Sequence, residues 1–294
     1  MRQAQRHPVS PQGDTIQVKG YTLRYQQMGQ GKPLVLLHGL GLMGDTWLEA
    51  MDHLKDRYRV IALDLLGFGY SDQPEIRYTL EDQVAFVVAF LDELGLKKVY
   101  LGGQGSGSMI ALRVMERHPE RVIAGVLSGA GGLNRRYPWW LRLLRARYVG
   151  DFISLLLGQR QLKDYLQRQY FDQTQVTDAL AARFAAPFAR SYLKDVLVQS
   201  LRSYDEWPAV EQAPRVACPV LVLWGEQDRL HPAQEGEILA QALPQGELQV
   251  VPNCGRLVHA EKPQLFAQRV EAFLRKLEEP QAHKVLPFTR RRYA

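Results

Sequence analysis

The chain has 294 residues, of which 46% are hydrophobic and 23% are charged, and its formal net charge is +6. This composition excludes a disordered chain and provides for a large buried core, and α/β folds of this length often form one domain. No apolar run approaches the ~20 residues of a membrane-spanning helix, and the polar residues 1–14, which we interpret as a flexible N-terminus, do not resemble a secretory signal.

Short apolar strands alternate with helical patterns along most of the chain. An opening hairpin precedes the expected strands, which lie at 33–39, 59–69, 97–103, 122–130, 219–228 and 247–253. The expected helices lie at 45–57, with Asp45 as the N-cap, and at 80–95, 109–118, 233–243 and 263–277. This alternation predicts an α/β fold with a mostly parallel, twisted sheet flanked by helices on both faces.

Residues 133–212 interrupt this alternation, because they contain several helical patterns and no convincing strand. We interpret them as a helical cap inserted into a core made of residues 15–132 and 213–278, with a basic tail at 279–294. An insertion after the fourth apolar strand would lie over the carboxyl ends of the strands, where such sheets place their ligand site.

Positive charge is concentrated in the first part of this cap. Residues 133–170 hold seven Arg and one Lys against two Asp, and residues 280–294 add four positive charges and no acid. Trp139 and Trp140 lie among these basic residues, and we expect their side chains to line a ligand pocket beneath the cap. A second hypothesis is that this basic, aromatic helix contacts an anionic membrane surface or a protein partner. We expect no nucleic-acid partner, and the sequence leaves the oligomeric state open.

The two cysteines, Cys218 and Cys254, form no disulfide framework and no metal motif, and the seven histidines lack metal-ligand spacing. These features indicate a cytoplasmic protein without a metal or another cofactor. A glycine motif at 39–44 follows a strand, and Asp64 comes 20 residues after Gly44, as in a dinucleotide-binding fingerprint. However, His38 stands directly before this motif, a hairpin precedes the strand, and Asp64 leads into a second glycine turn. We therefore expect no nucleotide here.

Five short motifs occur in a fixed order along the chain. They are His38-Gly39, Asp64-x-x-Gly67-x-Gly69-x-Ser71, the turn at 103–107, Gly225-x-x-Asp228, and Gly255 with Glu261-x-Pro263. In this ordered set the sequence resembles the α/β-hydrolase superfamily, especially its capped esterase, C–C hydrolase and epoxide-hydrolase-like branch. The resemblance covers roughly residues 15–278 and implies the α/β-hydrolase fold.

The resemblance also identifies a degenerate catalytic triad. The family's nucleophile elbow, G-x-S-x-G, aligns with residues 103–107, where Gly105 occupies the serine position. Glycine tolerates the strained turn, so we expect the turn to survive without an attacking oxygen. The acid position is retained as Asp228, but Arg256 follows Gly255 where the family has its histidine, and a guanidinium cannot accept a proton.

Two further expectations concern the geometry of this site. We predict that Arg256 and Asp228 form a salt bridge that replaces the His–Asp contact. The resemblance implies an oxyanion hole made by the backbone N–H groups of Leu40 and Ser106, which does not depend on side chains. The residues expected to contact the ligand are His38, Gly39, Gln104, Trp139 and Trp140.

Three functional hypotheses remain open from the sequence. In the first, the protein has no serine chemistry, as in a pseudoenzyme, and binds a small apolar carbonyl-bearing or anionic ligand between cap and core, or performs non-covalent chemistry there. In the second, it hydrolyses esters or related bonds with relocated groups, Ser106 and either His259 or His231, beside Asp228. Otherwise Ser106 is expected to cap the following helix, and His259 to lie in a loop or at the surface. In the third, it is an interaction or scaffold protein that acts through its basic cap and tail.

Overall fold

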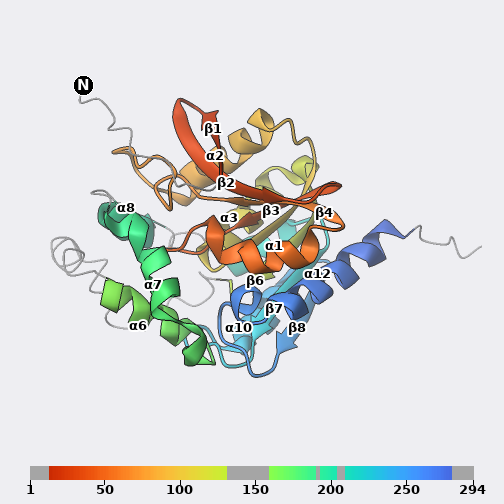
Figure 1. Cartoon of the computed structure of the whole chain (residues 1–294). Helices are drawn as coiled ribbons and strands as arrows, with labels where there is room; N and C mark the ends of the chain where they lie inside the picture. Colours follow the sequence, from red (N-terminus) through yellow and green to blue (C-terminus); the bar gives the residue numbers. More distant parts are fainter. Residues whose placement is uncertain (1–12, 131–158, 190–192, 204–208, 280–294) are drawn as a thin grey trace, which may run out of the picture.

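A computed structural model describes residues 13–130, 159–189, 193–203 and 209–279 (Figure 1). In these parts of the chain, eight strands form one sheet in the order β1-β2-β4-β3-β5-β6-β7-β8. The strands are β1 (Asp14–Val18), β2 (Tyr21–Met28), β3 (Lys32–Leu37), β4 (Tyr58–Leu63), β5 (Val99–Gln104), β6 (Val122–Ser128), β7 (Val220–Gly225) and β8 (Gly246–Val251). Strand β2 runs antiparallel to β1 and β4, and the other neighbours pair in parallel. The predicted fold class is therefore confirmed.

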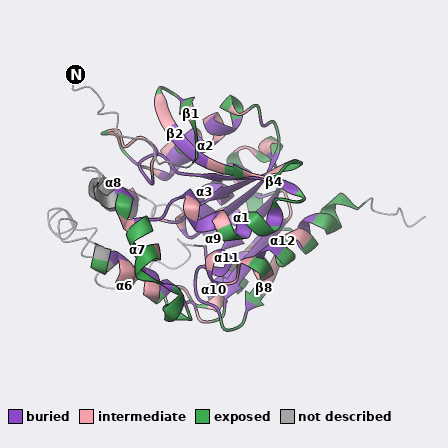
Figure 2. Ribbon diagram, viewed as in Figure 1, coloured by how far each residue is buried: buried purple, intermediate pink, exposed green. Residues whose placement is uncertain are grey.

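The period of two along each strand divides its side chains between two hydrophobic cores. In β3, Val35 and Leu37 face one core, whereas Leu34 and Leu36 face the other. The helices that pack in the first core are α2 (Leu80–Glu93), α3 (Ser106–Arg117) and α10 (Ala233–Ala242). Those in the second are α1 (Leu48–Leu54), α11 (Val258–Glu261) and α12 (Pro263–Glu278). Figure 2 shows the sheet buried between these two layers.

Several predicted strands extend too far at their carboxyl ends. The strand expected at 59–69 ends at Leu63, because the chain turns at the fully buried Asp64. Gly67 and Gly69 in this turn have φ values of 90° and 53°, which disfavour side chains. The helix expected from Met109 begins earlier, at Ser106, directly after the sharp bend that follows β5.

Asp45 does not cap a helix, contrary to the prediction. It lies inside a 3₁₀ turn, Gly44–Trp47, whose N-cap is Met43 and has no side-chain cap. The Asp45 carboxylate instead binds two arginines from distant segments, which local sequence patterns do not reveal.

The described part of residues 133–212, the segment predicted to form a cap and called the cap below, is helical. Its α-helices are α6 (Gln159–Gln169), α7 (Asp178–Ala185), α8 (Leu193–Ser203) and α9 (Ala209–Gln212). Leu166 and Phe184 from this segment pack with Met43 and Leu257, which follow β3 and β8. The cap therefore contacts the core beyond the carboxyl ends of the strands, to one side of the sheet in Figure 1.

Some predictions fall outside the described parts of the chain. They concern Trp139 and Trp140, the basic run at the start of the cap, most of the N-terminal segment 1–14 and the tail 280–294. Asp14 is an exception, since it already belongs to β1. The proposed limits of the cap stay predictions. Among the helices that the structure describes, none is both long and apolar enough to span a bilayer.

Candidate functional site

Gly105 forms the sharp bend between β5 and α3. Its φ of 56° and ψ of −118° lie in a region that side chains rarely adopt. A Cβ on Gly103 or Gly107 would collide with backbone, at 2.3 Å from the Gly107 carbonyl oxygen and 2.4 Å from that of Leu37. A Cβ on Gly105 would instead make ordinary contacts, 3.4 Å from Arg256 Nη2 and 3.7 Å from Gly39 Cα. The bend predicted at 103–107 is thus centred on Gly105, where a Cβ would have room beside Arg256 and Gly39.

Arg256 and Asp228 form the predicted salt bridge. Arg256 Nη1 lies 3.0 Å from Asp228 Oδ2, and the two side chains are 8% and 0% exposed. The other carboxylate oxygen accepts the backbone N–H groups of Leu230 at 2.9 Å and His231 at 3.0 Å. The pair uses a single Arg256 nitrogen, so Nη2 is left facing the bend at Gly105.

Close backbone contacts position Arg256 between core and cap. Its N–H donates to the carbonyl of Gln169 in the cap at 2.7 Å. A Cβ on Gly255 would lie 2.3 Å from that same carbonyl oxygen, so only glycine allows this approach. Gly129, after β6, has a φ of 48°, and a Cβ there would lie 3.0 Å from the Arg256 carbonyl oxygen. Two glycines therefore let the cap and β6 approach Arg256 closely.

Glu261 connects the segment before Arg256 to the cap. Its buried carboxylate accepts the N–H groups of Gly255 at 2.7 Å, Phe171 at 3.1 Å and Asp172 at 2.8 Å. A carboxylate is suited to this task because it accepts several hydrogen bonds at once. The Glu261-x-Pro263 motif thus has a structural role at the site, which the sequence alone did not specify.

Tyr165 of α6 is a site residue that the sequence analysis missed. Burial raises the pKa of its phenol, with smaller opposing effects from the charges of Arg256 and Asp228. The charges of Arg256 and Asp228 thus act on the Tyr165 phenol, which stays neutral. The only available signal was its place in a helical pattern of the cap, which does not identify the face that meets the core.

The oxyanion hole predicted at the backbone N–H groups of Leu40 and Ser106 stays a prediction. In the described parts of the chain, the N–H groups of Leu40 and Ser106 have no acceptor. His38 fixes the loop before Leu40, since its Nε2 accepts the Leu65 N–H at 3.0 Å and its Nδ1 lies 2.8 Å from the Gly39 carbonyl oxygen. This pairing assigns the proton to Nδ1, and burial lowers the pKa of His38 to about 4. The imidazole is thus a neutral loop anchor.

Gln104 and Gly39 meet beside this loop. The Gln104 side chain is buried, and its Oε1 would lie 2.2 Å from a Cβ on Gly39. Gly39 therefore permits Gln104 to pack against the backbone next to Leu40. These two residues lie beside the bend at Gly105, as expected, and contact with a ligand stays a prediction for both.

The groups considered for a relocated triad are not brought together. His259 is fully buried in α11, where its ring stacks on Trp47 at 3.8 Å between centroids and its Nε2 lies 3.0 Å from Thr46 Oγ1. The expected loop or surface position of His259 is wrong, because α11 packs against the segment before α1. His231 pairs through Nδ1 with Glu235 at 2.8 Å. Ser106 is the first residue of α3 and provides no cap, contrary to expectation, since the N-cap is Gly105.

The burial of His259 predicts an acid-sensitive fold. Burial lowers its pKa to about 3, whereas an unfolded histidine titrates near pH 6.5. Between these values only the unfolded state binds the proton. The contribution of neutral His259 to the free energy of unfolding is therefore fully present above about pH 6.5 and is lost as the pH decreases. From pH 6.5 to 5, this residue alone is expected to lower the free energy of unfolding by about 2 kcal/mol.

Urea unfolding at several pH values measures this effect. His259→Phe should reduce the pH dependence of stability by about one proton, whatever its effect on stability at neutral pH. The exposed His53 provides the control, since His53→Phe should leave the slope unchanged. Equal slopes for wild type and His259→Phe would contradict the assignment.

Neither cysteine is an available nucleophile. Both are free thiols, and burial raises the pKa of Cys218 to about 11 and that of Cys254 to about 12. Cys254 is packed in the core. Among the described residues, no three His, Cys, Asp or Glu side chains gather as a metal-ligand set requires.

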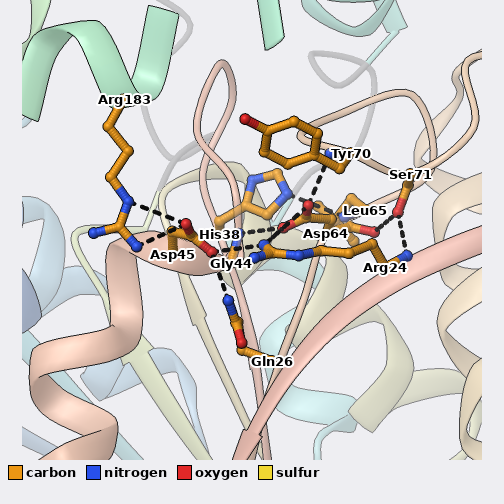
Figure 3. Close-up of polar contacts among 10 residues, drawn as sticks. All are labelled: Arg24, Gln26, His38, Gly44, Asp45, Asp64, Leu65, Tyr70, Ser71 and Arg183. Carbon is orange, nitrogen blue, oxygen red and sulfur yellow. Dashed lines mark hydrogen bonds and ion pairs between the residues drawn. The ribbon is translucent and has the colours of Figure 1, made fainter. Parts of the chain in front are cut away.

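A buried network of charges connects β2, the loop after β3, the turn after β4 and the cap (Figure 3). Arg24 Nη1 lies 2.6 Å from Asp45 Oδ1 and 3.3 Å from Asp64 Oδ1. The second Asp45 oxygen lies 2.7 Å from Nη2 of Arg183, in α7 of the cap. Arg24 and Asp64 are fully buried, whereas the Arg183 side chain is 43% exposed. This network links the core to the cap.

Asp64 has a structural role in this network. Its carboxylate accepts the N–H groups of Gly44 at 2.6 Å and Tyr70 at 2.8 Å, besides its contact with Arg24. A fully buried acid with these partners is not available for a ribose hydroxyl. In the glycine motif at 39–44, Gly44 therefore serves close packing against Asp64, since a Cβ there would lie 3.0 Å from Asp64 Oδ1, and the absence of a nucleotide stays a prediction.

Comparisons with known proteins agree with this architecture. The family model described as alpha/beta hydrolase fold matches residues 32–263. The 2-hydroxymuconate semialdehyde hydrolase of Pseudomonas putida is 33% identical over 273 residues, which cover 89% of this chain and 94% of that protein. The chain therefore belongs to the α/β-hydrolase fold family, and its relatives include hydrolases.

Solved structures share the fold. A bacterial membrane phospholipase A is 26% identical, with a TM-score of 0.78, and the match covers 92% of this chain and 87% of that one. A meta-cleavage product hydrolase from Pseudomonas fluorescens IP01 is 23% identical, with a TM-score of 0.78 and coverage of 90% and 98%. The second likeness concerns the fold alone.

Proposed function

We propose that this member of the α/β-hydrolase fold family has lost serine chemistry and binds a small, mostly apolar carbonyl-bearing or anionic ligand between cap and core, or performs non-covalent chemistry there. The observation that carries the proposal is the identity of the residues at the bend and opposite it. Gly105 has the strained backbone of a nucleophile elbow but no hydroxyl, and the retained Asp228 orients a guanidinium in place of an imidazole. Among the described residues, the N–H groups of Leu40 and Ser106 have no acceptor, and a Cβ on Gly105 would meet no atom closer than 3.4 Å, which supports a ligand at this bend.

A relocated hydrolase is the second candidate, because curated relatives are hydrolases and Ser106 adjoins the bend. It lacks a base, however. Among the described contacts, His259 is engaged by Thr46 and Trp47, and His231 by Glu235. General-base catalysis needs an imidazole within hydrogen-bond reach of the hydroxyl, directly or through one water.

Reaction with a fluorophosphonate probe tests the proposal. The wild-type protein is expected to show no stoichiometric labelling and no turnover of short p-nitrophenyl esters above a weak background. An oxyanion hole alone can leave roughly 10³-fold acceleration over water, so slow hydrolysis would not restore the serine mechanism. Stoichiometric labelling that Ser106→Ala abolishes would establish the relocated hydrolase instead.

We further propose that the basic start of the cap assists contact with an anionic membrane or a protein partner. The charge excess of residues 133–170 supports this proposal. Flotation with vesicles that contain or lack anionic lipid tests membrane contact. Binding is expected only with anionic lipid and at low salt, and an absence of salt-sensitive binding would contradict it.

A further inference from the structure

We propose that Arg256 and the amino end of α3 form a carboxylate-binding site for an apolar acid. One carboxylate oxygen would accept hydrogen bonds from the backbone N–H groups of Leu40 and Ser106. The other oxygen would accept a hydrogen bond from Nη2 of Arg256. The acid would therefore occupy the space over Gly105. This inference rests on the proposed function and deepens it, since it names the class of ligand.

The first observation is the unused half of the Arg256 guanidinium. The side chain is 8% exposed and its Nη1 binds Asp228, but no described residue accepts from Nη2. Nη2 lies 3.4 Å from the position of a Cβ on Gly105, so it is directed at the bend. Nη2 is not one of the fully buried side-chain atoms that lack a partner, so water reaches it, and an anionic ligand would replace that water with a charged acceptor.

The salt bridge with Asp228 leaves Arg256 able to bind a second anion. Three donors share the Asp228 carboxylate, namely the N–H groups of Leu230 and His231 and Nη1 of Arg256. The two backbone donors stabilise the negative charge independently of the arginine. The guanidinium can therefore bind a second carboxylate through Nη2.

The second observation is the uncapped start of α3. This helix has 12 residues, and its N-cap, Gly105, offers no side-chain acceptor. The positive end of the helix dipole and its free N–H groups favour an anion at this position. The Ser106 N–H belongs to this end, and the Leu40 N–H comes from the loop whose Gly39 Cα lies 3.7 Å from a Cβ on Gly105.

The arrangement favours a carboxylate over a neutral carbonyl. An ester or ketone has one carbonyl oxygen, which the two backbone donors would use, and Nη2 would stay without a strong acceptor. A carboxylate has two oxygens, one for each side of the site. The loop that carries Leu40 offers apolar contacts, since Leu40 is half-buried and Leu197 Cδ2 lies 3.5 Å from the position of a Cβ on Gly41. The tail of the acid should therefore be hydrocarbon.

Titration calorimetry with octanoate and octanamide tests the inference on the wild-type protein. These ligands share a tail and differ in charge, and octanoate is expected to bind at least tenfold more tightly. Arg256→Gln should weaken octanoate binding at least tenfold. Asp228→Asn should strengthen it, because it removes the anion that competes for Arg256. A purely structural pair would predict weaker binding from both variants.

Arg229→Gln is the matched control, because it removes the same charge from an exposed residue beside Asp228 and should leave affinity nearly unchanged. If Arg256→Gln does not fold, Gly105→Ala decides, since its methyl group would enter the site while the ion pair stays. Octanoate affinity unchanged in Gly105→Ala, or equal affinity for octanoate and octanamide, would overturn the inference. If octanoate does not bind at all, the inference is wrong as well. The proposed function would still stand, because only active-site labelling contradicts it.

Discussion

The double variant Gly105→Ser/Arg256→His is expected to react with a fluorophosphonate and to cleave short p-nitrophenyl esters, whereas each single variant remains inactive. The bend already has the required backbone, and a Cβ at position 105 meets no atom closer than 3.4 Å. Asp228 is in place to orient an imidazole at position 256, where Arg256 now contacts it at 3.0 Å. With both groups restored, ester turnover should rise by roughly 10²-fold or more over wild type.

The single variants fail for different reasons. Gly105→Ser alone places a hydroxyl beside a guanidinium, which cannot accept its proton. Arg256→His alone supplies a base without a nucleophile. Addition of Asp228→Asn to the double variant should reduce the gained turnover strongly, because the imidazole loses its orienting carboxylate. A folded double variant that is not labelled, or one whose labelling requires Ser106, would refute the assignment of Gly105 to the nucleophile position.

Much of the fold could be predicted because its determinants are local. The apolar run at 33–39 is continuous since β3 is covered on both faces, and it corresponds to Lys32–Leu37. The glycines at 103 and 107 marked a bend because backbone passes within 2.4 Å of any Cβ there. The salt bridge between Arg256 and Asp228 followed once both ends of the family pattern had been located. These features depend on neighbouring residues or on an ordered motif.

The parts that escaped prediction depend on partners far apart in the sequence. The local sequence predicts that Asp45 is a helix cap. Its carboxylate instead forms ion pairs with Arg24 and with Arg183, which is 138 residues away. The local sequence around His259 predicts a loop residue, but His259 contacts Thr46, which is 213 residues away, and the adjacent Trp47. In such cases tertiary contacts override the local preference, and only the spatial arrangement reveals them.

The buried charge network provides the second large expected effect. Arg24→Met should lower the free energy of unfolding by about 3–5 kcal/mol, because it leaves the carboxylates of Asp45 and Asp64 without their shared cation. Arg183→Met is the matched control. Its side chain is 43% exposed, so loss of its contact with Asp45 should cost about 1 kcal/mol or less. Urea unfolding at pH 7 measures both.

The pH dependence of this loss identifies its cause. Burial already raises the pKa of Asp64 above its usual value, with Arg24 acting in the opposite direction, so removal of Arg24 should raise that pKa further. A raised folded-state pKa means that the folded protein binds more protons than the unfolded chain as the pH falls towards the ordinary value of the acid. The deficit of Arg24→Met relative to wild type should therefore be smaller at pH 5 than at pH 7. Asp64→Asn should compensate part of the loss in the Arg24→Met background, because it removes the fully buried charge that Arg24 had paired, whereas Asp45 keeps Arg183. A deficit that is independent of pH and additive with Asp64→Asn would show that Arg24 stabilises the fold through packing alone.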